Sequence, residues 1–331
     1  MPDLKSWIPK LAGHRVLVIG DVILDEYLVG KTVRLSREAP IPVLEFESRQ
    51  LIPGGAANPA ANIVALGSIA VQVGVIGSDT SATNLRQILQ VRGIETNALI
   101  IDSTRPTTVK TRIMAQMGLR FPQQVARMDT LSREPISADT ERKVRAVIEQ
   151  EMSSAAAVLL SDYHTGLLTH SLVSTIQALA GSSRVLLTAD AQGQLDKYAH
   201  FDIVKCNAAE AADFLRRPLR TESDFNTAAR ELCNTLQLAR GMVITRGADG
   251  ATVAMPEAEP VHCPAPAVTD VYDTVGAGDT TIALITLAVA AGASLADATS
   301  LANYASGLVV RRVGNYAPTP AELIEALEDW G

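Results

Sequence analysis

The chain is poor in the side chains that build disulfide frameworks, zinc sites and aromatic surfaces. Its three cysteines, Cys206, Cys233 and Cys263, lie far apart and form no CxxC pair. This spacing argues against a disulfide scaffold or a zinc site and is typical of a protein from a reducing compartment. Aromatic residues make up only 4% of the 331 residues, which is thin for base stacking. Ala, Val, Leu and Ile must therefore build the core.

The sequence also lacks an excess of positive charge and a long apolar run. Lys and Arg number 29 against 36 Asp and Glu, so the net charge is −7, and no basic field exists to attract nucleic acid or anionic lipid. The N-terminal segment Met1–Gly13 has no apolar signal core, and the longest apolar stretch, Ile282–Ala291, is too short to span a bilayer. We expect a cytoplasmic protein with neither a nucleic-acid nor a membrane partner.

Short apolar runs alternate with amphipathic segments along most of the sequence. The runs predicted to form buried strands are Arg15–Gly20, Val71–Ile76, Ala157–Ser161, Val185–Asp190, Ile203–Cys206 and Met242–Thr245. The segments predicted to form helices are Thr83–Arg92, Asp139–Met152, Ser171–Ala180 and Phe225–Leu236. This alternation predicts an α/β fold with a doubly wound, mostly parallel sheet covered on both faces. No Gly/Ser-rich linker divides the chain, so we expect one domain over residues 1–331.

Two stretches interrupt this alternation. Pro42–Phe46 and Thr107–Asp129 are rich in Val, Thr and alternating polar positions, which indicates exposed strands with one apolar face. We expect a small antiparallel β lid, with strands from about 26–50 and 102–130. Its apolar positions include Val43, Leu44, Ile113 and Val125. Because an exposed strand pair leaves an open edge, we expect a homodimer that forms through the lid.

The most informative local sequence is DTVGAGD, residues 273–279, which precedes a long apolar helical segment from Thr280. Gly276 and Gly278 allow close approach of the backbone, and a helix start offers unpaired N–H groups at the positive end of the dipole. Such a turn binds an anion. Asp279 by itself would be an ordinary helix-start carboxylate. With a second acid, Asp273, six residues earlier and an anion site between them, Asp279 is interpreted as a base beside a phosphate.

The DTVGAGD run resembles the C-terminal motif of the ribokinase-like (PfkB) sugar kinases. A second motif of that family, the Gly-Gly pair of GGAAN at 54–58, occurs about 220 residues earlier, and the resemblance extends from about Arg15 to Leu327. It implies the ribokinase-like fold and an ATP- and Mg²⁺-dependent phosphotransferase that acts on an alcohol group of a carbohydrate.

The resemblance assigns roles to individual residues. It implies that Asp279 takes a proton from the acceptor hydroxyl while the N–H groups of 275–278, including Gly276, Ala277 and Gly278, stabilise the moving phosphoryl group. The residues implied to hold the sugar are Asp25, Gly54, Gly55 and Asn58. The residues implied to bind the nucleotide are Asn207, Glu210, Thr245, Gly247, Gly250 and Asn303. Among these, Asn207 and Glu210 would hold Mg²⁺ through water, and Asn303, in the expected helix Leu301–Val310, would line the adenine pocket. Asp273, through its carbonyl, is assigned to a monovalent cation such as K⁺.

Three further segments are similar to the kinases of D-glycero-β-D-manno-heptose 7-phosphate, in the form that is not fused to a nucleotidyltransferase. They are TVRLSREAPIPV at 32–43, RPTTVKTR at 105–112 and QQVARMD at 123–129. The residues that this similarity implies for substrate binding are Arg34, Lys110, Arg112, Gln124 and Arg127. The four cations would suit a sugar that already carries a phosphate, because guanidinium groups pair with phosphate oxygens in fork geometry. For each one alone, a solvated lid residue is the alternative.

Two positions depart from the heptose kinase pattern. Thr165 and Gln192 stand where those enzymes usually carry lysine, so two cations are missing near the expected cleft. Either the phosphate charge is handled elsewhere or the substrate differs. Two alternatives therefore remain open, namely a kinase of another sugar or of a nucleoside on the same fold, and a sugar-responsive binding protein without turnover. The intact turn at 276–279 argues against the second.

Overall fold

The computed structural model describes residues 3–116 and 122–330. In this part of the chain, the main body is built on a nine-stranded sheet with the strand order β13-β12-β11-β10-β9-β8-β1-β4-β5. Its strands are β1 (Arg15–Gly20), β4 (Ile69–Ile76), β5 (Leu99–Ile101), β8 (Ala157–Ser161), β9 (Leu186–Asp190), β10 (Ile203–Asn207), β11 (Gly241–Thr245), β12 (Ala251–Ala254) and β13 (Val261–Cys263). Neighbouring strands run parallel from β5 to β11, and β12 and β13 are antiparallel additions. The six predicted strands are confirmed to within two residues at each end.

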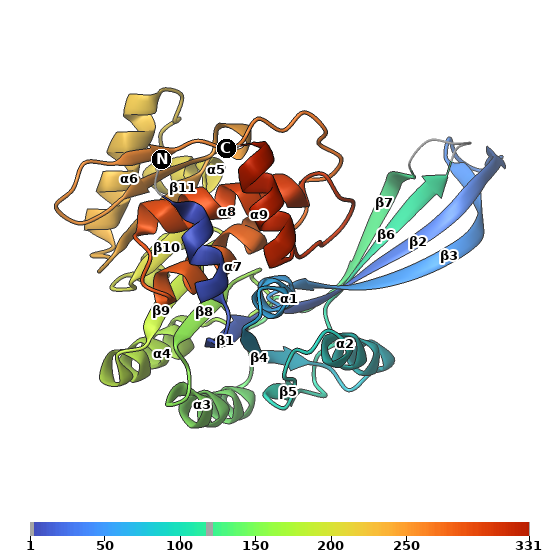
Figure 1. Ribbon diagram of the computed structural model, residues 1–331. Helices are drawn as coiled ribbons and strands as arrows, with labels where there is room; N and C mark the ends of the chain where they lie inside the picture. The colour runs from blue at the N-terminus through green and yellow to red at the C-terminus, as the bar shows by residue number, and fades with distance from the viewer. Residues whose placement is uncertain (1–2, 117–121, 331) are drawn as a thin grey trace.

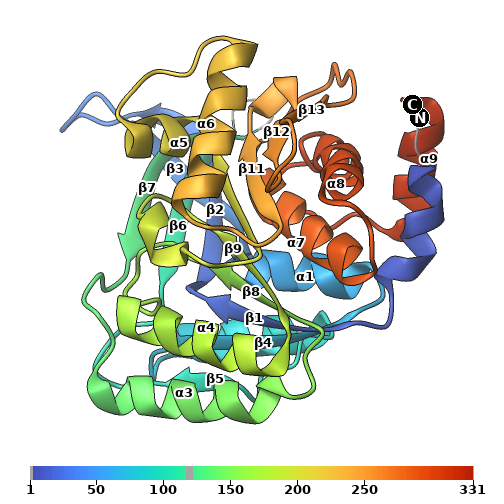
Figure 2. The same cartoon turned by 90° about the vertical axis from the view of Figure 1, so that its left-hand side faces the viewer.

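Helices cover both faces of this sheet (Figure 2). One apolar cluster includes residues of η1 (Leu4–Leu11), α1 (Ala57–Ala65), α2 (Thr80–Val91), α7 (Ala277–Ala290), α8 (Leu295–Val309) and α9 (Pro320–Asp329). The other includes residues of α3 (Ala138–Met152), α4 (His170–Ser183), α5 (Ala208–Leu215) and α6 (Glu222–Thr235), and the short η2 (Leu195–Tyr198). Among the described residues, every helix falls short of the length and apolar character that a bilayer crossing needs.

The alternation of side chains along β1 shows why this sheet needs helices on both sides. Val16 and Val18 belong to the cluster that contains α1 and α7, whereas Leu17 and Ile19 belong to the cluster that contains α3 and α4. Successive side chains of a strand point to opposite faces. A continuous apolar run is therefore stable only when both faces are dry, and the doubly wound α/β fold is confirmed.

A second sheet extends away from the body as a long arm (Figure 1), and we call it the lid. Its strands are β2 (Val22–Leu35), β3 (Pro42–Gly55), β6 (Val109–Gln116) and β7 (Gln123–Thr130), in the order β3-β2-β6-β7. The two hairpins β2–β3 and β6–β7 are antiparallel, and the central pair β2–β6 is parallel. The first lid strand begins at Val22, before the expected start near residue 26, so the lid grows directly out of the end of β1. The part of the expected lid at 117–121 lies outside the described residues.

The strand order places a switch point beside β1. From β1 the chain continues to β4 and β5 on one side, and it then returns to β8 on the other side and proceeds to β11. In open α/β sheets, ligands bind outside the carboxyl ends of the strands at such a point. At this edge lie Asp21, Asp190, Asn207 and Thr245, which end or directly follow four of the parallel strands.

Candidate active site

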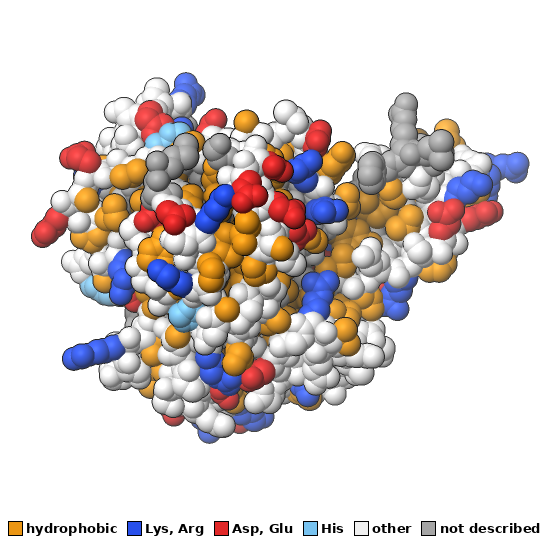
Figure 3. Space-filling model, in the orientation of Figure 1, with side chains coloured by type: hydrophobic (Ala, Val, Ile, Leu, Met, Phe, Trp, Pro, Cys, Tyr) orange, Lys and Arg blue, Asp and Glu red, His pale blue; other side chains and the backbone are white. Residues whose placement is uncertain are grey.

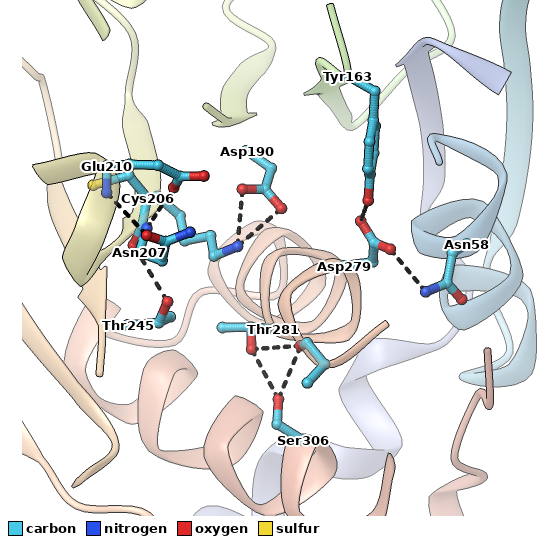
Figure 4. A network of polar contacts seen from close by, with 12 residues as sticks. Asn58, Tyr163, Asp190, Cys206, Asn207, Glu210, Thr245, Asp279, Thr281 and Ser306 are labelled. Atoms are coloured by element: carbon cyan, nitrogen blue, oxygen red, sulfur yellow. Dashed lines mark hydrogen bonds and ion pairs between the residues drawn. The ribbon is translucent and has the colours of Figure 1, made fainter. Parts of the chain in front are cut away.

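Asp279 lies in the first turn of α7 and is held by two side chains from distant parts of the sequence. Asn58 of α1 donates through Nδ2 to one carboxylate oxygen at 2.9 Å, and the Tyr163 hydroxyl donates to the other at 2.9 Å. Figure 4 shows both side chains pointing at the carboxylate. Helix α7 begins at Ala277, three residues before the expected start, so Asp279 belongs to the helix and has a fixed backbone.

The surroundings of Asp279 change its acidity. Burial and the nearby charge of Asp190 raise the pKa of Asp279 from 3.8 to about 7, and the hydrogen bonds from Asn58 and Tyr163 limit the rise. A pKa near the working pH is the property that lets a general base take a proton and release it again. The environment of Asp279 therefore suits the predicted base.

The turn before α7 offers fewer free N–H groups than the sequence suggested. The Val275 N–H donates to Asp273 Oδ1 at 3.0 Å, and the Ala277 N–H donates to the Thr274 carbonyl at 3.4 Å. Among the described residues, the N–H groups of Gly276 and Gly278 donate to no protein acceptor. Two of the four expected donors are therefore left for an anion.

Both glycines of this turn leave space for neighbouring side chains, and Gly276 also adopts a backbone conformation that favours glycine. Gly276 has a φ of +84°, and a Cβ there would lie 2.7 Å from Asn58 Nδ2. A Cβ at Gly278 would lie 2.8 Å from the ammonium nitrogen of Lys205. Because real Cβ atoms do not approach so closely, a larger residue at either position would displace the Asn58 amide or the Lys205 ammonium.

The carboxylate of Asp273 makes two hydrogen bonds to backbone N–H groups near the start of α7. It accepts from the Val275 N–H and, through the other oxygen, from the Gly314 N–H at 2.9 Å. The side chain thus fixes the turn between β13 and α7. The role of its carbonyl in holding K⁺ stays a prediction.

Asp25, on β2, is buried and already paired. It forms an ion pair with Arg112 of β6, and Asn315 Nδ2 donates to its Oδ2 at 3.1 Å. Gly54 faces it, because a Cβ at that position would lie 2.0 Å from Asp25 Oδ2. Gly55 has a φ of +57° and packs against the Asp21 carbonyl. The predicted sugar anchor is therefore assembled from both lid hairpins.

The register of the lid decides which of its cations share a face with Asp25. Asp25 lies opposite Lys110, and Arg112 lies opposite both Tyr27 and Arg127. Since side chains two residues apart on a strand share a face, Asp25, Lys110, Arg112 and Arg127 lie on one side of the lid. Gln124, opposite Met114, lies on this side too. Lys110 reaches the Tyr163 ring, with its ammonium 4.9 Å from the ring centroid.

Arg34 lies apart from these cations. It is exposed near the far end of β2, nine residues beyond Asp25, and its guanidinium donates to the Leu35 carbonyl. At about 3.3 Å per residue this is roughly 30 Å along the strand. Arg127, although it is on the correct face, is exposed and paired with Asp129 at 2.9 Å. The structure therefore brings Lys110 and Arg112 to Asp25 and leaves Arg34 away from it in this chain.

A cavity of about 480 Å³ lies between the turn at 276–279 and the ends of β9, β10 and β11. Six of its lining residues were predicted to act in catalysis or nucleotide binding, besides Asp279 itself: Asn207, Glu210, Thr245, Gly247, Gly276 and Gly278. Asn303 instead donates to the carbonyls of Cys263 and Pro264 at 2.8 and 3.2 Å. Gly250 has a φ of +84° and packs against the Cys263 carbonyl. These two residues shape the backbone beside the cavity.

Asn207 and Glu210 form a capping box at the start of α5. Asn207 Oδ1 accepts from the Glu210 N–H at 2.9 Å, and Glu210 Oε2 accepts from the Asn207 N–H at 2.7 Å. Burial raises the pKa of Glu210. Among the described residues, no group of three or more His, Cys, Asp and Glu is placed to hold a metal. The pair fits a magnesium ion that takes most of its ligands from phosphate and water, because one carboxylate oxygen remains outside the capping box.

The sequence reasoning missed three residues of this site. Tyr163 binds Asp279, Lys205 lines the cavity, and Asn315 holds Asp25. Tyr163 follows the carboxyl end of β8 at the switch point, and this position could have singled it out. Lys205 lies inside the apolar strand β10, where no sequence signal marks it. Of the two departures from the heptose kinase pattern, Gln192 lines the cavity. Thr165 is buried, where its N–H donates to Asp21 and its carbonyl accepts from Arg105.

Comparisons with known proteins identify relatives of this chain. The chain is 36% identical over 325 residues to the bifunctional protein HldE of Hyphomonas neptunium and 38% identical over 329 residues to that of Caulobacter vibrioides. Each match covers 98% of this chain and 65% of the relative, so the chain spans just under two thirds of the length of these proteins.

Two solved structures share the fold. Arabidopsis thaliana ribokinase, complexed with ribose and ATP, matches with a TM-score of 0.73 and 20% identity over 96% of this chain and 99% of its own. Phosphofructokinase-2 of Escherichia coli, in complex with potassium, matches with a TM-score of 0.76 and 18% identity over 96% and 98%. The model of the pfkB family carbohydrate kinases matches residues 14–322. The chain therefore belongs to the pfkB family of carbohydrate kinases, which are phosphotransferases that act on a sugar hydroxyl.

Proposed function

We propose that this kinase transfers the γ-phosphoryl group of ATP to a sugar that already carries a phosphate, with heptose 7-phosphate converted to the 1,7-bisphosphate. The observation that carries the proposal is the lid face on which Lys110 and Arg112 lie beside Asp25. Lys110 also contacts the ring of Tyr163, whose hydroxyl donates to Asp279. Two cations at the sugar end of a chain with a net charge of −7 fit an anionic acceptor. The HldE relatives support the same substrate class.

The residues divide the reaction between them. Asp25 accepts hydrogen bonds from sugar hydroxyls, and Asp279 takes the proton of the attacking hydroxyl. Asn58 and Tyr163 keep the Asp279 carboxylate in place through their 2.9 Å hydrogen bonds. The N–H groups of Gly276 and Gly278 stabilise the charge on the moving phosphoryl group, which is the largest contribution in this kind of catalysis.

The nucleotide occupies the cavity that Asn207, Glu210, Thr245 and Gly247 line. Asn207 and Glu210 are the residues that would hold Mg²⁺ through water, and the bound ion would neutralise charge on the triphosphate. The Glu210 carboxylate, near the helix N-terminus of α5, is fixed for this purpose by its own capping box. This arrangement needs no preformed metal cluster.

Steady-state kinetics with a panel of acceptors tests the proposal. We expect the highest kcat/KM for heptose 7-phosphate, a lower value for fructose 6-phosphate and the lowest for the unphosphorylated heptose. Equal or better use of a free sugar would refute the phosphate requirement and leave the family assignment intact. Preference for fructose 6-phosphate would favour the second candidate, a kinase of another sugar phosphate, for which the glutamine at position 192 is the supporting observation.

A further inference from the structure

Lys205 is a buried cation of the cavity to which no role has yet been given. It lies on β10, two residues before Asn207, and is 5% exposed. Its ammonium donates to both carboxylate oxygens of Asp190, at 2.8 and 2.9 Å. Lys205 and Asp190 both line the cavity that contains Gly278 and Asp279. A charged pair therefore sits in the wall of the proposed nucleotide site.

The Lys205 ammonium lies directly against the first turn of α7. A methyl group at Gly278 would come within 2.8 Å of Nζ, so the ammonium and the free N–H group of Gly278 border the same small space. The N-terminus of a helix carries partial positive charge. Asp190 already balances the ammonium charge, and a phosphoryl group placed beside Gly278 would meet both the ammonium and the positive end of the helix.

The other cation that lines the cavity is engaged elsewhere. Arg246 also lines the cavity, but its guanidinium pairs with Glu222 at 2.7 Å and stacks on Phe225. Lys205 is thus the cation placed to meet a phosphate beside Gly278.

We propose that Lys205, held in place by Asp190, donates to the γ-phosphoryl oxygens of the nucleotide and stabilises their charge during transfer. The inference rests on the proposed phosphoryl transfer. In that step the acceptor O–H gives its proton to Asp279, and a new bond forms from the acceptor oxygen to the γ-phosphorus. The bond from that phosphorus to the bridging oxygen breaks, and ADP leaves with the electron pair. Lys205 keeps its protons throughout.

The proposal also explains how the cavity functions without a lysine at position 192. Gln192 and Lys205 line the same cavity from the ends of neighbouring strands, β9 and β10. The cationic side chain of Lys205, on β10, lies next to Gly278. The neutral side chain of Gln192 adds no second cation to the cavity. Lysine at 192 should therefore restore part of what is lost when Lys205 is removed.

The chain offers a matched control for a merely structural role. Lys197 is also buried, forms an ion pair with Asp162 and donates to the Leu168 carbonyl at 2.9 Å. This pair does not line the cavity that holds Asp279. The double variants Lys205→Met/Asp190→Asn and Lys197→Met/Asp162→Asn each remove one buried pair without leaving an unpaired charge. Only the first removes a cation from the cavity.

Kinetics and binding of Mg·ADP and Mg·AMP-PNP test the proposal. We expect Lys205→Met/Asp190→Asn to lower kcat by about 10²–10³, the cost of removing one donor to a developing oxyanion. The Kd of this variant for ADP should stay within about threefold of the wild-type value. The wild-type protein should bind AMP-PNP more tightly than ADP, and the variant should lose this difference in affinity. The Lys197 control should keep kcat. Adding Gln192→Lys to Lys205→Met should raise kcat at least about tenfold, because a cation returns to the cavity.

Three outcomes would overturn the proposal. They are a kcat within about threefold of wild type, an equal loss of ADP and AMP-PNP affinity, and an equal kcat loss in the Lys197 control. If the Lys205/Asp190 variant does not fold, Lys205→Gln, whose amide still donates to Asp190, is measured against the same criteria. A wild-type protein that phosphorylates no acceptor would refute the proposed function, and the ADP and AMP-PNP affinities would still decide the role of Lys205.

Discussion

At the scale of single residues, the site depends on one carboxylate whose properties are set by its neighbours. Asp279 is 6% exposed and receives two hydrogen bonds, from Asn58 and Tyr163. Each donor stabilises the charged form, while burial and Asp190 favour the neutral form. The balance leaves the carboxylate basic enough to take a proton from an alcohol near neutral pH.

Replacement of Asp279 by asparagine should separate catalysis from folding. We expect Asp279→Asn to lower kcat by about 10²–10⁴, the range for loss of a general base, with the KM for ATP nearly unchanged. The Tyr163 hydroxyl can rotate to accept from the new amide, so the packing survives. Turnover comparable to wild type in a coupled ADP-release assay would remove Asp279 from the mechanism.

The melting temperature of Asp279→Asn shows whether the variant is still folded, and it serves as a control for the loss of activity. The folded pKa of Asp279, about 7, lies above the ordinary 3.8, so the native state holds this proton more tightly than the unfolded chain. The contribution of Asp279 to stability therefore falls as pH rises from about 4 to 7. Asp279→Asn should melt at a higher temperature than wild type at pH 8 and close to it at pH 4. A lower melting temperature at pH 8 would show that the loss of activity includes a folding defect.

The pH dependence of turnover should report this carboxyl and its tyrosine partner. In wild type, kcat/KM for the acceptor should rise with pH and level off above about 7, because the base must be ionised to act. Tyr163→Phe removes one hydrogen bond that lowers the pKa of Asp279, so the rising limb should move to higher pH. An unchanged limb in the variant would mean that the hydroxyl does not act on the base.

At the scale of secondary-structure elements, the loops that follow the parallel strands position the residues around Asp279. The register of the lid strands decides which cationic side chains lie near Asp25. Tyr163 follows β8 and is positioned through its N–H, which donates to Asp21 after β1 at 2.9 Å. The parallel pairing of β2 with β6 sets Lys110 opposite Asp25. A shift of one residue in this register would turn Lys110 and Arg112 to the other face.

Lys110 and Arg34 form a matched pair of lid variants. If Lys110 meets the phosphate of the acceptor, Lys110→Ala should raise KM for the sugar phosphate roughly 10- to 150-fold, equivalent to about 1.5–3 kcal/mol for a charge-assisted hydrogen bond. The KM for ATP should hardly change. Arg34→Ala removes the same charge far from Asp25 and should leave the monomeric site unaffected. Equal effects of the two variants would show that the lid acts through its overall charge.

At the scale of the whole molecule, the lid exposes apolar surface that the body does not cover. Hydrophobic side chains lie along the lid arm in Figure 3. The exposed fractions are 70% for Leu35, 69% for Phe46, 62% for Met128 and 43% for Val125. All side chains of β7 are exposed. β7 is also the last strand in the described order of the lid sheet, and an edge strand with exposed apolar side chains favours association with a second lid.

We predict that the protein is a dimer that pairs through its lids. Sedimentation at micromolar concentration should give twice the mass of the 35.1 kDa chain. The variant Phe46→Glu/Met128→Glu should shift it to monomers, because it places charge in the apolar contact. A matched change at an exposed position of the body, Val91→Glu, should leave the dimer intact. A monomeric wild type would refute the prediction.

The sequence by itself determined the layout of the main sheet and pointed to the turn at 276–279 as the place to look for an anion site. Apolar runs of four to six residues such as Arg15–Gly20 are stable only between two layers of helices, so the pattern predicted the strands to within two residues. The Gly-x-Gly-Asp turn carries its chemistry locally, because the helix start and the two glycines are properties of neighbouring residues. The proposed base and the Gly-Gly motif could therefore be singled out without coordinates.

Tertiary structure alone decided which side chains meet at the site. Tyr163 reaches Asp279 across 116 residues of sequence, and Asn315 reaches Asp25 across 290. Arg34 and Arg112 look alike in the sequence, but strand register brings only Arg112 to Asp25. Lys205 was hidden within an apolar strand. These contacts depend on how distant segments align in space, and no local pattern records that alignment.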